Sequence, residues 1–288
     1  MKFSDKEIAS YYDQTQNHYE RWWKLNDSQS VHYGLWGHDT KSFVEALKNT
    51  NQVMAEIGSI FSGSKILDAG SGVGGAAFYL AEKLDCDVTG ITLSDKQLKT
   101  ANQVLASLGV ESKVRFEKQS FMQTGFEDNS FDVVWACESS CYAIPKTGFY
   151  DEVYRILKPG GKLIVADYFL TKKGELDKNR NVKNWGDLWA ISDFYKAASF
   201  EKLIERSGFK INSKKDYTKE ITKSSRWMYY ASILAAPVSF IYGSLIKTSR
   251  FAKHHYRSGI FQYRALKNQE WQYWITCLEK PINNPSED

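Results

Sequence analysis

Short apolar and β-branched runs alternate with longer amphipathic stretches through the middle of the chain. The expected strands span residues 65–69, 87–91, 114–118, 131–136 and 162–168. The expected helices span residues 74–84, 95–108 and 148–157. Strands that alternate with helices in this way are typical of a parallel sheet with helices on both faces. The pattern therefore predicts a doubly wound α/β fold.

The chain on either side of this core has a different pattern. Helical spacing dominates as far as about residue 61, with Ser4 as the expected cap of one helix and a second helix beginning near Thr40. Beyond the core we expect a polar loop, further helices and two strands, at 171–183, 185–206, 209–215 and 272–279. The three expected regions are an N-terminal helical cap, a core, and a lid with the last strands of the sheet, over 1–62, 63–170 and 171–288.

One apolar segment has the length of a membrane span. Residues 227–246 contain no charged residue, and about 20 apolar residues suffice to cross a bilayer. Pro237 and Gly243 interrupt the segment, however, and serine and tyrosine side chains dilute it. We therefore expect a lid that is buried or touches a membrane surface rather than a transmembrane helix. Simple packing in the core is the alternative.

Composition narrows the class of protein. Of the 288 residues 42% are hydrophobic and 25% are charged, which is typical of a globular chain and not of disorder or a coiled coil. The formal net charge is +4 with the basic residues scattered, so we expect no nucleic-acid partner. The four cysteines have no CxxC spacing and no secretory leader is evident, which predicts a cytoplasmic protein with reduced thiols and no metal site.

Aromatic residues are unusually frequent and unevenly placed. They make up 15% of the chain, with nine Trp and seventeen Tyr. One group lies within the first forty residues and another between residues 227 and 274. We expect the two ends of the chain to meet over one site.

A glycine-rich turn follows the first expected strand. Gly70, Gly72 and Gly75 fit the dinucleotide fingerprint GxGxxG, which alone is weak evidence. A dinucleotide site also needs an acidic residue at the end of the second strand, where this chain has the sequence Gly-Ile-Thr-Leu-Ser. Asp68, just before the glycines, would suit a cationic ligand better than a pyrophosphate. The residues therefore favour S-adenosylmethionine over NAD, and a nicotinamide-dependent oxidoreductase is the rival interpretation.

Several segments in order resemble the class I S-adenosylmethionine-dependent methyltransferases, and within them the group of sterol C-methyltransferases and tocopherol methyltransferases. The likeness covers about Tyr11 to Phe169 and rests on segments 66–75, 90–97, 121–132 and 157–161. It implies a Rossmann-like, mostly parallel sheet of seven strands, with a helical, aromatic-rich cap that closes over the acceptor. The lid after residue 170 is where we expect the choice of acceptor to be made.

The resemblance also implies the residues that hold the cofactor. Asp68 would anchor its methionine end. Ser120 stands where the family usually has an acidic residue for the adenine amine, so that contact would be weaker here or would pass through the backbone of Phe121. The glycines under the methionine part would be Gly70, Gly72 and Gly74, and the residues near the ribose would be Gln97 with Thr92 or Leu93.

The segment 135–142 follows the fourth strand and should border the ligand crevice, because ligands of such sheets bind at the carboxyl ends of the strands. It resembles the sterol group and also bacterial enzymes that C-methylate prenyl diphosphates. If the acceptor is an alkene, methyl transfer leaves a carbocation that ring faces stabilise and that one carboxylate deprotonates. Glu138 is the expected base, with Tyr142 beside the cation and His32 as a second base or hydrogen-bond donor. The expected aromatic wall consists of Tyr12, Trp22, Trp23, Tyr33 and Tyr142.

Three questions stay open at this level. Basic residues after residue 170 could grip a diphosphate, with or without Mg²⁺, or could simply be solvated. Methylation could instead fall on nitrogen, oxygen or an aromatic ring of a hydrophobic molecule. A protein that binds the cofactor without turnover, acting as an interaction module at a membrane surface, is the alternative from another class.

Overall fold

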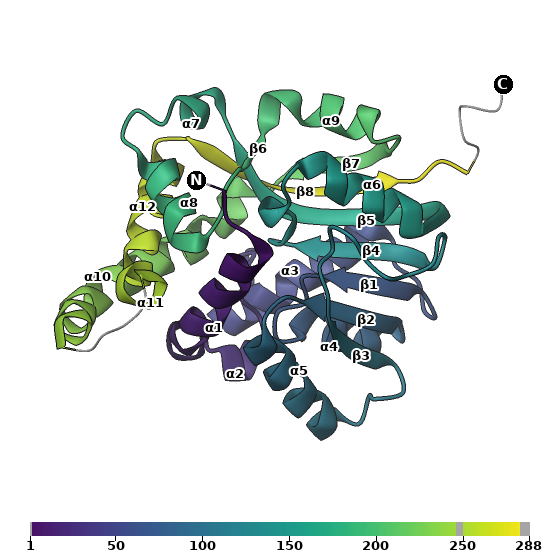
Figure 1. The fold of residues 1–288 in the computed structure, drawn as a ribbon, viewed down its shortest axis with the longest axis horizontal. Helices are drawn as coiled ribbons and strands as arrows, with labels where there is room; N and C mark the ends of the chain where they lie inside the picture. The colour runs from purple at the N-terminus through teal and green to yellow at the C-terminus, as the bar shows by residue number, and fades with distance from the viewer. Residues whose placement is uncertain (1, 246–249, 283–288) are drawn as a thin grey trace.

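The computed structural model describes residues 2–245 and 250–282, and its centre is one mixed β-sheet (Figure 1). The strands are β1 (Lys65–Ala69), β2 (Asp87–Thr92), β3 (Val114–Lys118), β4 (Phe131–Cys137), β5 (Leu157–Leu170), β6 (Tyr195–Lys196), β7 (Lys210–Asp216) and β8 (Trp271–Glu279). Their order across the sheet is β3-β2-β1-β4-β5-β8-β7, and β6 pairs with the end of β5. The sheet thus contains the seven expected strands and one additional short strand, β6.

The direction of the strands confirms the mostly parallel arrangement. β1 to β5 run parallel, whereas β8 runs antiparallel to both β5 and β7. β1 pairs with β2 on one side and with β4 on the other, so the strand order reverses at β1. In a doubly wound sheet such a reversal opens a crevice at the carboxyl ends of the strands, where ligands bind. The fold therefore places the glycine turn after β1 and the segment after β4 at one crevice.

The sheet separates two hydrophobic cores because successive side chains of a strand point to opposite faces. Within β4, Val133 and Trp135 pack into one core and Val134 and Ala136 into the other. The first core includes α3 (Phe43–Gly58) and α4 (Gly75–Leu84), and the second includes α6 (Lys146–Ile156) and α9 (Phe200–Arg206). The first core also draws on all three expected regions, through Tyr11, Leu80 and Trp271 among others.

The N-terminal region lies over the start of the core. Ser4 caps α1 (Asp5–Trp22) in a reciprocal capping box with Glu7, as expected from the sequence. A short helix α2 (Leu25–Ser28) follows. Asp13 of α1 accepts hydrogen bonds from the Ser94 hydroxyl and the Lys96 N–H, at 2.5 and 3.3 Å. Ser94 and Lys96 lie at the start of α5 (Asp95–Leu108). Their hydrogen bonds to Asp13 therefore hold α1 beside the carboxyl end of β2.

The C-terminal helices gather at one end of the molecule in Figure 1. They are α8 (Asn181–Trp189), α10 (Thr218–Leu245), α11 (Arg250–His254) and α12 (Ser258–Lys267). The two aromatic groups of the sequence meet there, because the rings of Tyr11 in α1 and Phe251 in α11 lie edge to face with centroids 5.4 Å apart.

The prediction of a polar loop at 171–183 is wrong. This stretch forms α7 (Lys172–Leu176) and the beginning of α8. Its polar residues act as caps: Thr171 accepts a hydrogen bond from the Gly174 N–H, and Asp177 accepts from Val182 and Lys183 at the start of α8. Short polar side chains that satisfy helix ends look like loop residues in a hydropathy pattern.

The described part of the apolar segment belongs to α10, which continues through Pro237; residue 246 lies outside the described residues. One face of α10 is buried, with Met228, Ala231 and Ser232 each less than 10% exposed. The opposite face leaves Trp227, Tyr230, Ile233 and Leu234 between 43% and 70% exposed. Among the described helices, none has the length and apolar character that crossing a bilayer requires.

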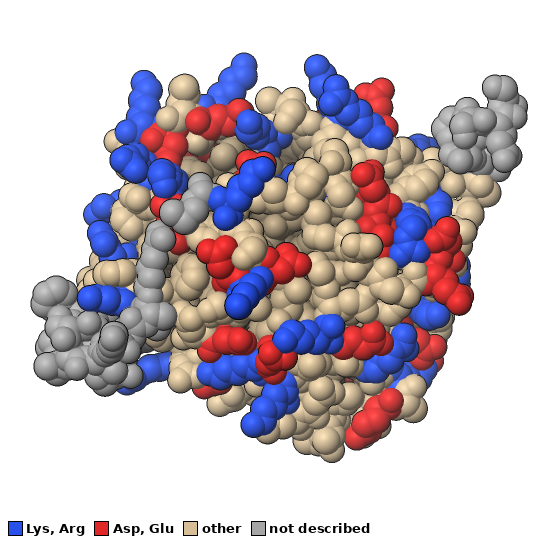
Figure 2. Space-filling view, in the orientation of Figure 1, with Lys and Arg blue, Asp and Glu red and all other residues tan. Residues whose placement is uncertain are grey.

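Charges of both signs are spread over the molecule. On most of the face seen in Figure 2, Lys and Arg side chains lie among Asp and Glu side chains. This part of the surface therefore carries no broad patch of one sign.

Candidate active site

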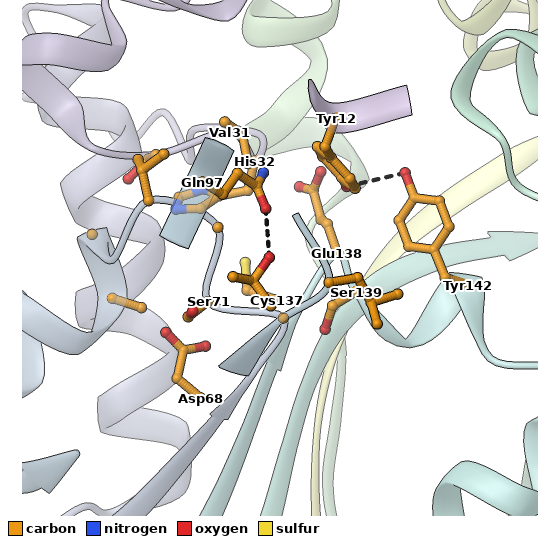
Figure 3. A pocket seen from close by; sticks show the side chains of 18 of the residues that line it. Tyr12, Val31, His32, Asp68, Ser71, Gln97, Cys137, Glu138, Ser139 and Tyr142 are labelled. Carbon is orange, nitrogen blue, oxygen red and sulfur yellow. Dashed lines mark hydrogen bonds between the residues drawn. The ribbon is translucent and has the colours of Figure 1, made fainter. Parts of the chain in front are cut away.

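A cavity of about 950 Å³ opens at the carboxyl ends of β1, β2 and β4 (Figure 3). Its walls come from α1, the segment 29–32, the glycine turn, the end of β2 and the segment 137–142. Figure 3 shows Asp68, Ser71 and Gln97 on one side of this space and Tyr12, Glu138 and Tyr142 on the other.

The glycine turn brings the ends of β1 and β4 into close contact. Gly70 has a φ of +93°, and a Cβ atom there would lie 2.4 Å from the Cβ atom of Ser139. The Ser139 hydroxyl donates to the carbonyl of Ala69 at 2.5 Å. Gly72 also has a positive φ, +56°, and lines the cavity. Only glycine combines this backbone conformation with so close an approach.

The other glycine expected at the cofactor has a different place. Gly74 caps α4, lies outside the described wall of the cavity and faces Phe116 and Phe78. A Cβ atom on Gly74 would lie 2.6 and 2.8 Å from ring atoms of these two residues. Gly75, by contrast, lines the cavity. The close ring contacts at Gly74 show that packing of α4 onto β3 requires a glycine there.

Four N–H groups of the turn donate to carbonyls inside the protein. The N–H groups of Gly70 and Ser71 both donate to the carbonyl of Ile91, at 3.0 and 2.9 Å. Those of Gly74 and Gly75 donate to Ser71 and Gln29. A pyrophosphate site needs such donors to face the ligand. These four donors are thus already used and do not face a ligand.

Asp68 is buried beside the glycine turn, and one of its carboxyl oxygens lacks a hydrogen bond. Its side chain is 2% exposed, and within the described part of the chain its Oδ2 atom has no hydrogen-bond partner. Burial raises the pKa of Asp68 to about 7. A buried carboxyl group with a free oxygen attracts a positively charged group, since an opposite charge offsets the loss of hydration. The site therefore fits the cationic end of a ligand.

The residues expected near ribose and adenine divide into two groups. Thr92, Leu93, Gln97 and Phe121 line the cavity. The Thr92 hydroxyl donates to Oε1 of Gln97 at 2.8 Å, which orients the Gln97 amide. Ser120 lies outside the described wall, and its hydroxyl accepts a hydrogen bond from the Met122 N–H at 3.4 Å.

Glu138 is held by three donors in a strained backbone position. It follows β4 with a φ of +51°, a conformation that costs a non-glycine residue about 1–3 kcal/mol and is concentrated at functional sites. Oε1 accepts from the Tyr33 N–H at 2.6 Å and from the Tyr273 hydroxyl at 2.8 Å. Oε2 accepts from the Tyr168 hydroxyl.

The environment of Glu138 suits proton transfer near neutral pH. The residue is 9% exposed and lines the cavity, and burial raises its pKa to about 8, against the lowering effect of the three donors. A general base works best when its pKa lies near the working pH. Strongly shifted groups in a cleft are also typical of functional sites.

Tyr12 and Tyr142 form one aromatic corner beside Glu138. Their hydroxyl groups lie 3.1 Å apart, and their rings meet edge to face with centroids 5.8 Å apart. The Tyr142 hydroxyl also donates to the carbonyl of Trp189 at 3.1 Å. Both tyrosines line the cavity, together with Trp189 of α8.

The other expected aromatic residues lie elsewhere. The Tyr33 ring is fully buried behind Glu138, with ring centroids 5.9 Å from Tyr168 and Trp271, and it lies outside the described wall. The Trp23 indole donates to the carbonyl of His32 at 3.0 Å and does not line this cavity. The side chain of Trp22 lies outside the described part of the structure.

His32 lines the cavity as a neutral group. Its Nδ1 lies 2.9 Å from the carbonyl of Tyr33, so Nδ1 carries the proton, and within the described residues Nε2 is buried without a partner. Burial lowers the pKa of His32 to about 4. Nε2 can therefore accept a hydrogen bond near neutral pH, but it is a weaker base than Glu138.

Sequence reasoning missed several residues of the site. Tyr19, Tyr168 and Trp189 line the cavity, and Tyr273 binds Glu138 from β8. Tyr168 stands near the carboxyl end of β5, a position that the topology of such sheets marks as a border of the crevice. The others carry no local motif.

The fold and the residues of the crevice define a class of protein. Residues 67–165 match the family model described as a methyltransferase domain. The match covers the strands and glycine turn that build the cofactor side of the site. Residues 67–165 therefore form a methyltransferase domain of the class I, S-adenosylmethionine-dependent type.

Known proteins narrow this class. A sterol 24-C-methyltransferase of Debaryomyces hansenii is 32% identical over 213 residues, which are 72% of this chain and 55% of that protein. The chain thus spans about half the length of this curated relative, and it resembles the sterol C-methyltransferase group.

Solved structures show the same fold at lower identity. The [4+2]-cyclase SpnF has a TM-score of 0.79 at 23% identity, with 98% of each chain covered. A geranyl diphosphate methyltransferase in complex with GPP and sinefungin has a TM-score of 0.76 at 16% identity, covering 96% of this chain and 99% of that one.

Proposed function

We propose that the protein is an S-adenosylmethionine-dependent methyltransferase that adds a methyl group to a carbon of an isoprenoid double bond. The observation that carries this proposal is the buried Glu138 carboxyl group, poised near neutral pH between tyrosine hydroxyls and facing the same cavity as Asp68. The likeness to sterol 24-C-methyltransferases supports the same reaction class.

The residues present fit the cofactor. The free oxygen of Asp68 would hold its positively charged amino group, and the glycine floor at Gly70 and Gly72 leaves room for the methionine part. Thr92 and Gln97 offer polar groups for a ribose. S-adenosylmethionine supplies, when bound, a methyl group already activated by a positively charged sulfur.

The chain's own residues then have two tasks. The electron pair of the double bond forms the new carbon–carbon bond, the methyl–sulfur bond of the donor would break with its electron pair left on sulfur, and a positive charge remains on the neighbouring acceptor carbon. The ring faces of Tyr12, Tyr142 and Trp189 stabilise that charge, each by about 0.5–2 kcal/mol when water is excluded. Glu138 takes the proton from the adjacent carbon, and the electron pair of the broken C–H bond restores the double bond.

The donors around Glu138 prepare it for this step. The Tyr33 N–H and the hydroxyls of Tyr168 and Tyr273 all point at its oxygens and favour the ionised form. They also fix the carboxyl group, so that little reorganisation is needed when the proton arrives.

We further propose that the acceptor is uncharged, such as a sterol or prenylated quinol, rather than a prenyl diphosphate. Among the described residues that form the cavity wall, none is Lys or Arg. A diphosphate needs charged donors, for which Arg is the usual choice.

The test is a transfer assay with labelled cofactor and a panel of sterols, prenylated quinols, prenyl diphosphates, amines and phenols. We expect label on carbon of a neutral isoprenoid. Label only on nitrogen or oxygen would contradict the proposal. Tight cofactor binding with no product from any acceptor would favour the alternative, a binding module without turnover.

We also propose that the protein is cytoplasmic and touches a membrane surface through α10. The exposed apolar face of this helix is flanked by the exposed basic residues Lys223 and Arg226. Apolar side chains beside basic ones suit a surface of anionic lipid.

Sedimentation with vesicles tests this contact. We expect binding to phosphatidylserine-containing vesicles and weaker binding to neutral ones. Leu234→Ser should weaken binding about tenfold, because a buried leucine contributes roughly 1.5–3 kcal/mol. Ile282→Ser changes an equally exposed apolar side chain away from α10 and should have no effect. Equal sedimentation of all three proteins would contradict the contact.

A further inference from the structure

A second cavity, of about 530 Å³, lies directly beside the first. The two cavities share wall residues, because Tyr19 and Trp189 line both. The remaining walls of the second cavity come from α1, α10, the start of α12 and the short turn His255–Arg257. Two side chains therefore stand between the crevice at Glu138 and a space under α10.

α10 contributes Met228 and three small side chains to the wall of the second cavity. Ala231, Ser232 and Ala235 line it and leave a hollow that larger residues would fill. α12 packs closely at the same place, since a Cβ atom on Gly259 would lie 2.2 Å from the Ser232 hydroxyl oxygen. The hollow is thus framed by tight helix packing and not by a gap between loops.

The polar groups in this cavity are uncharged. Nδ1 of His18 lies 3.2 Å from Nδ1 of His255, and Nε2 of His255 lies 3.0 Å from the Tyr11 hydroxyl. Tyr11 in turn lies 2.8 Å from the hydroxyl of Tyr19. Burial lowers the pKa of both histidines, that of His255 to about 3.

Most of these polar groups have partners: His18 bonds to His255, Tyr19 to Tyr11, and the Trp23 indole to the carbonyl of His32, whereas within the described residues Nε1 of Trp189 is buried without one. Within the described wall there is no Lys, Arg, Asp or Glu. Such a space favours an apolar, uncharged occupant.

We propose that the two cavities are consecutive parts of one acceptor channel, with the reacting double bond beside Glu138 and a long apolar tail beneath α10. This inference rests on the proposed function and narrows the acceptor to isoprenoids too long for the first cavity, which also has to hold the cofactor. Tyr19 and Trp189 form the passage between the two parts.

A plug in the second cavity tests the channel by ligand binding. Ala235→Phe fills the hollow, and Ala236→Phe makes the same substitution at the next position of α10, outside the described wall. Ala231→Val is a milder plug that keeps the test valid if the larger one disturbs folding, which thermal unfolding would report. The probes are tritiated geranylgeraniol and geraniol, with twenty and ten carbons, bound in the presence of S-adenosylhomocysteine.

Each methylene kept out of an apolar site weakens binding about fourfold. We therefore expect Ala235→Phe to weaken geranylgeraniol binding at least tenfold and geraniol binding less than twofold. Ala231→Val should have a smaller effect in the same direction, and Ala236→Phe should change neither. Equal effects on the two probes, or no effect of either plug, would overturn the channel.

The outcome separates the channel from the reaction. Loss of binding that depends on chain length, without methylated product from any isoprenoid, would keep the channel and reject the proposed function. Product formation with unchanged length dependence in the plugged variants would do the reverse.

Discussion

Glu138→Gln lowers kcat by about 10²–10⁴, the usual contribution of a positioned general base, while the affinity for S-adenosylhomocysteine stays within twofold. Glutamine has the same shape and can still accept hydrogen bonds from Tyr33 and Tyr273 through its amide oxygen. It cannot take a proton from the acceptor. Steady-state kinetics with the best isoprenoid acceptor and calorimetric titration of the cofactor product measure the two quantities.

A second substitution tests whether the donors around Glu138 set the pKa of its carboxyl group. Tyr273→Phe removes one donor to Glu138, which raises the pKa of the carboxyl group and moves the acid limb of the pH–rate profile to higher pH. Tyr150→Phe also removes a buried tyrosine hydroxyl, the partner of Tyr195 at 3.2 Å, and should leave the profile in place. For the first substitution, a kcat of Glu138→Gln close to that of the natural protein would show that Glu138 is not the general base.

The same carboxyl group links stability to pH. The pKa of Glu138 is raised from 4.5 to about 8 in the folded protein, so the folded state holds a proton that the unfolded chain releases. Its contribution to the free energy of unfolding is complete below about pH 4.5 and is lost as the pH rises through 8. Asp68 acts in the same direction, with its pKa raised from 3.8 to about 7. Urea unfolding should show that Glu138→Gln loses less stability than the natural protein between pH 5.5 and 8.5.

Gly70→Ala destabilises the protein by about 2–5 kcal/mol and weakens binding of S-adenosylhomocysteine at least tenfold. The positive φ costs an L-residue about 1–2 kcal/mol, and overpacking adds about 1–3 kcal/mol. The overpacking arises because the new methyl group would meet the Cβ atom of Ser139 at 2.4 Å. The Ser139 hydroxyl is hydrogen-bonded to the carbonyl of Ala69, so Ser139 cannot move away from the new methyl group without separating the ends of β1 and β4.

Gly63→Ala is the matched control. Gly63 has a similar φ, +81°, but nothing lies within 4 Å of an added Cβ atom. The control should therefore lose only about 1–2 kcal/mol for its backbone conformation and bind the cofactor product normally. Urea unfolding and calorimetric titration measure both variants. Equal losses in the two proteins would show that the contact with Ser139 imposes nothing on the site.

Local sequence signals predicted the core well where they agreed with one another. The bounds of β1, β3 and α5 match the expected ranges, because alternation, helix spacing and the Ser94 cap all lie within a few residues of each element. The stretch 171–183 failed because its polar residues serve as helix caps. β6 carries only two residues, too few for any periodic pattern.

Local sequence patterns were sufficient to predict the parts of the site that lie within one turn of a strand end: Asp68, the glycines at 70 and 72, and Glu138. Strand ends of a doubly wound sheet meet at one crevice, so local order was enough to place them. Only the tertiary structure brought Tyr168 and Tyr273 to Glu138, and placed Tyr19 and Trp189 between two cavities. It also placed the Tyr33 ring outside the described wall of the cavity, so that Tyr33 contributes its backbone N–H as a donor to Glu138. Contacts between residues so far apart along the chain depend on how whole elements pack, and no local pattern encodes that packing.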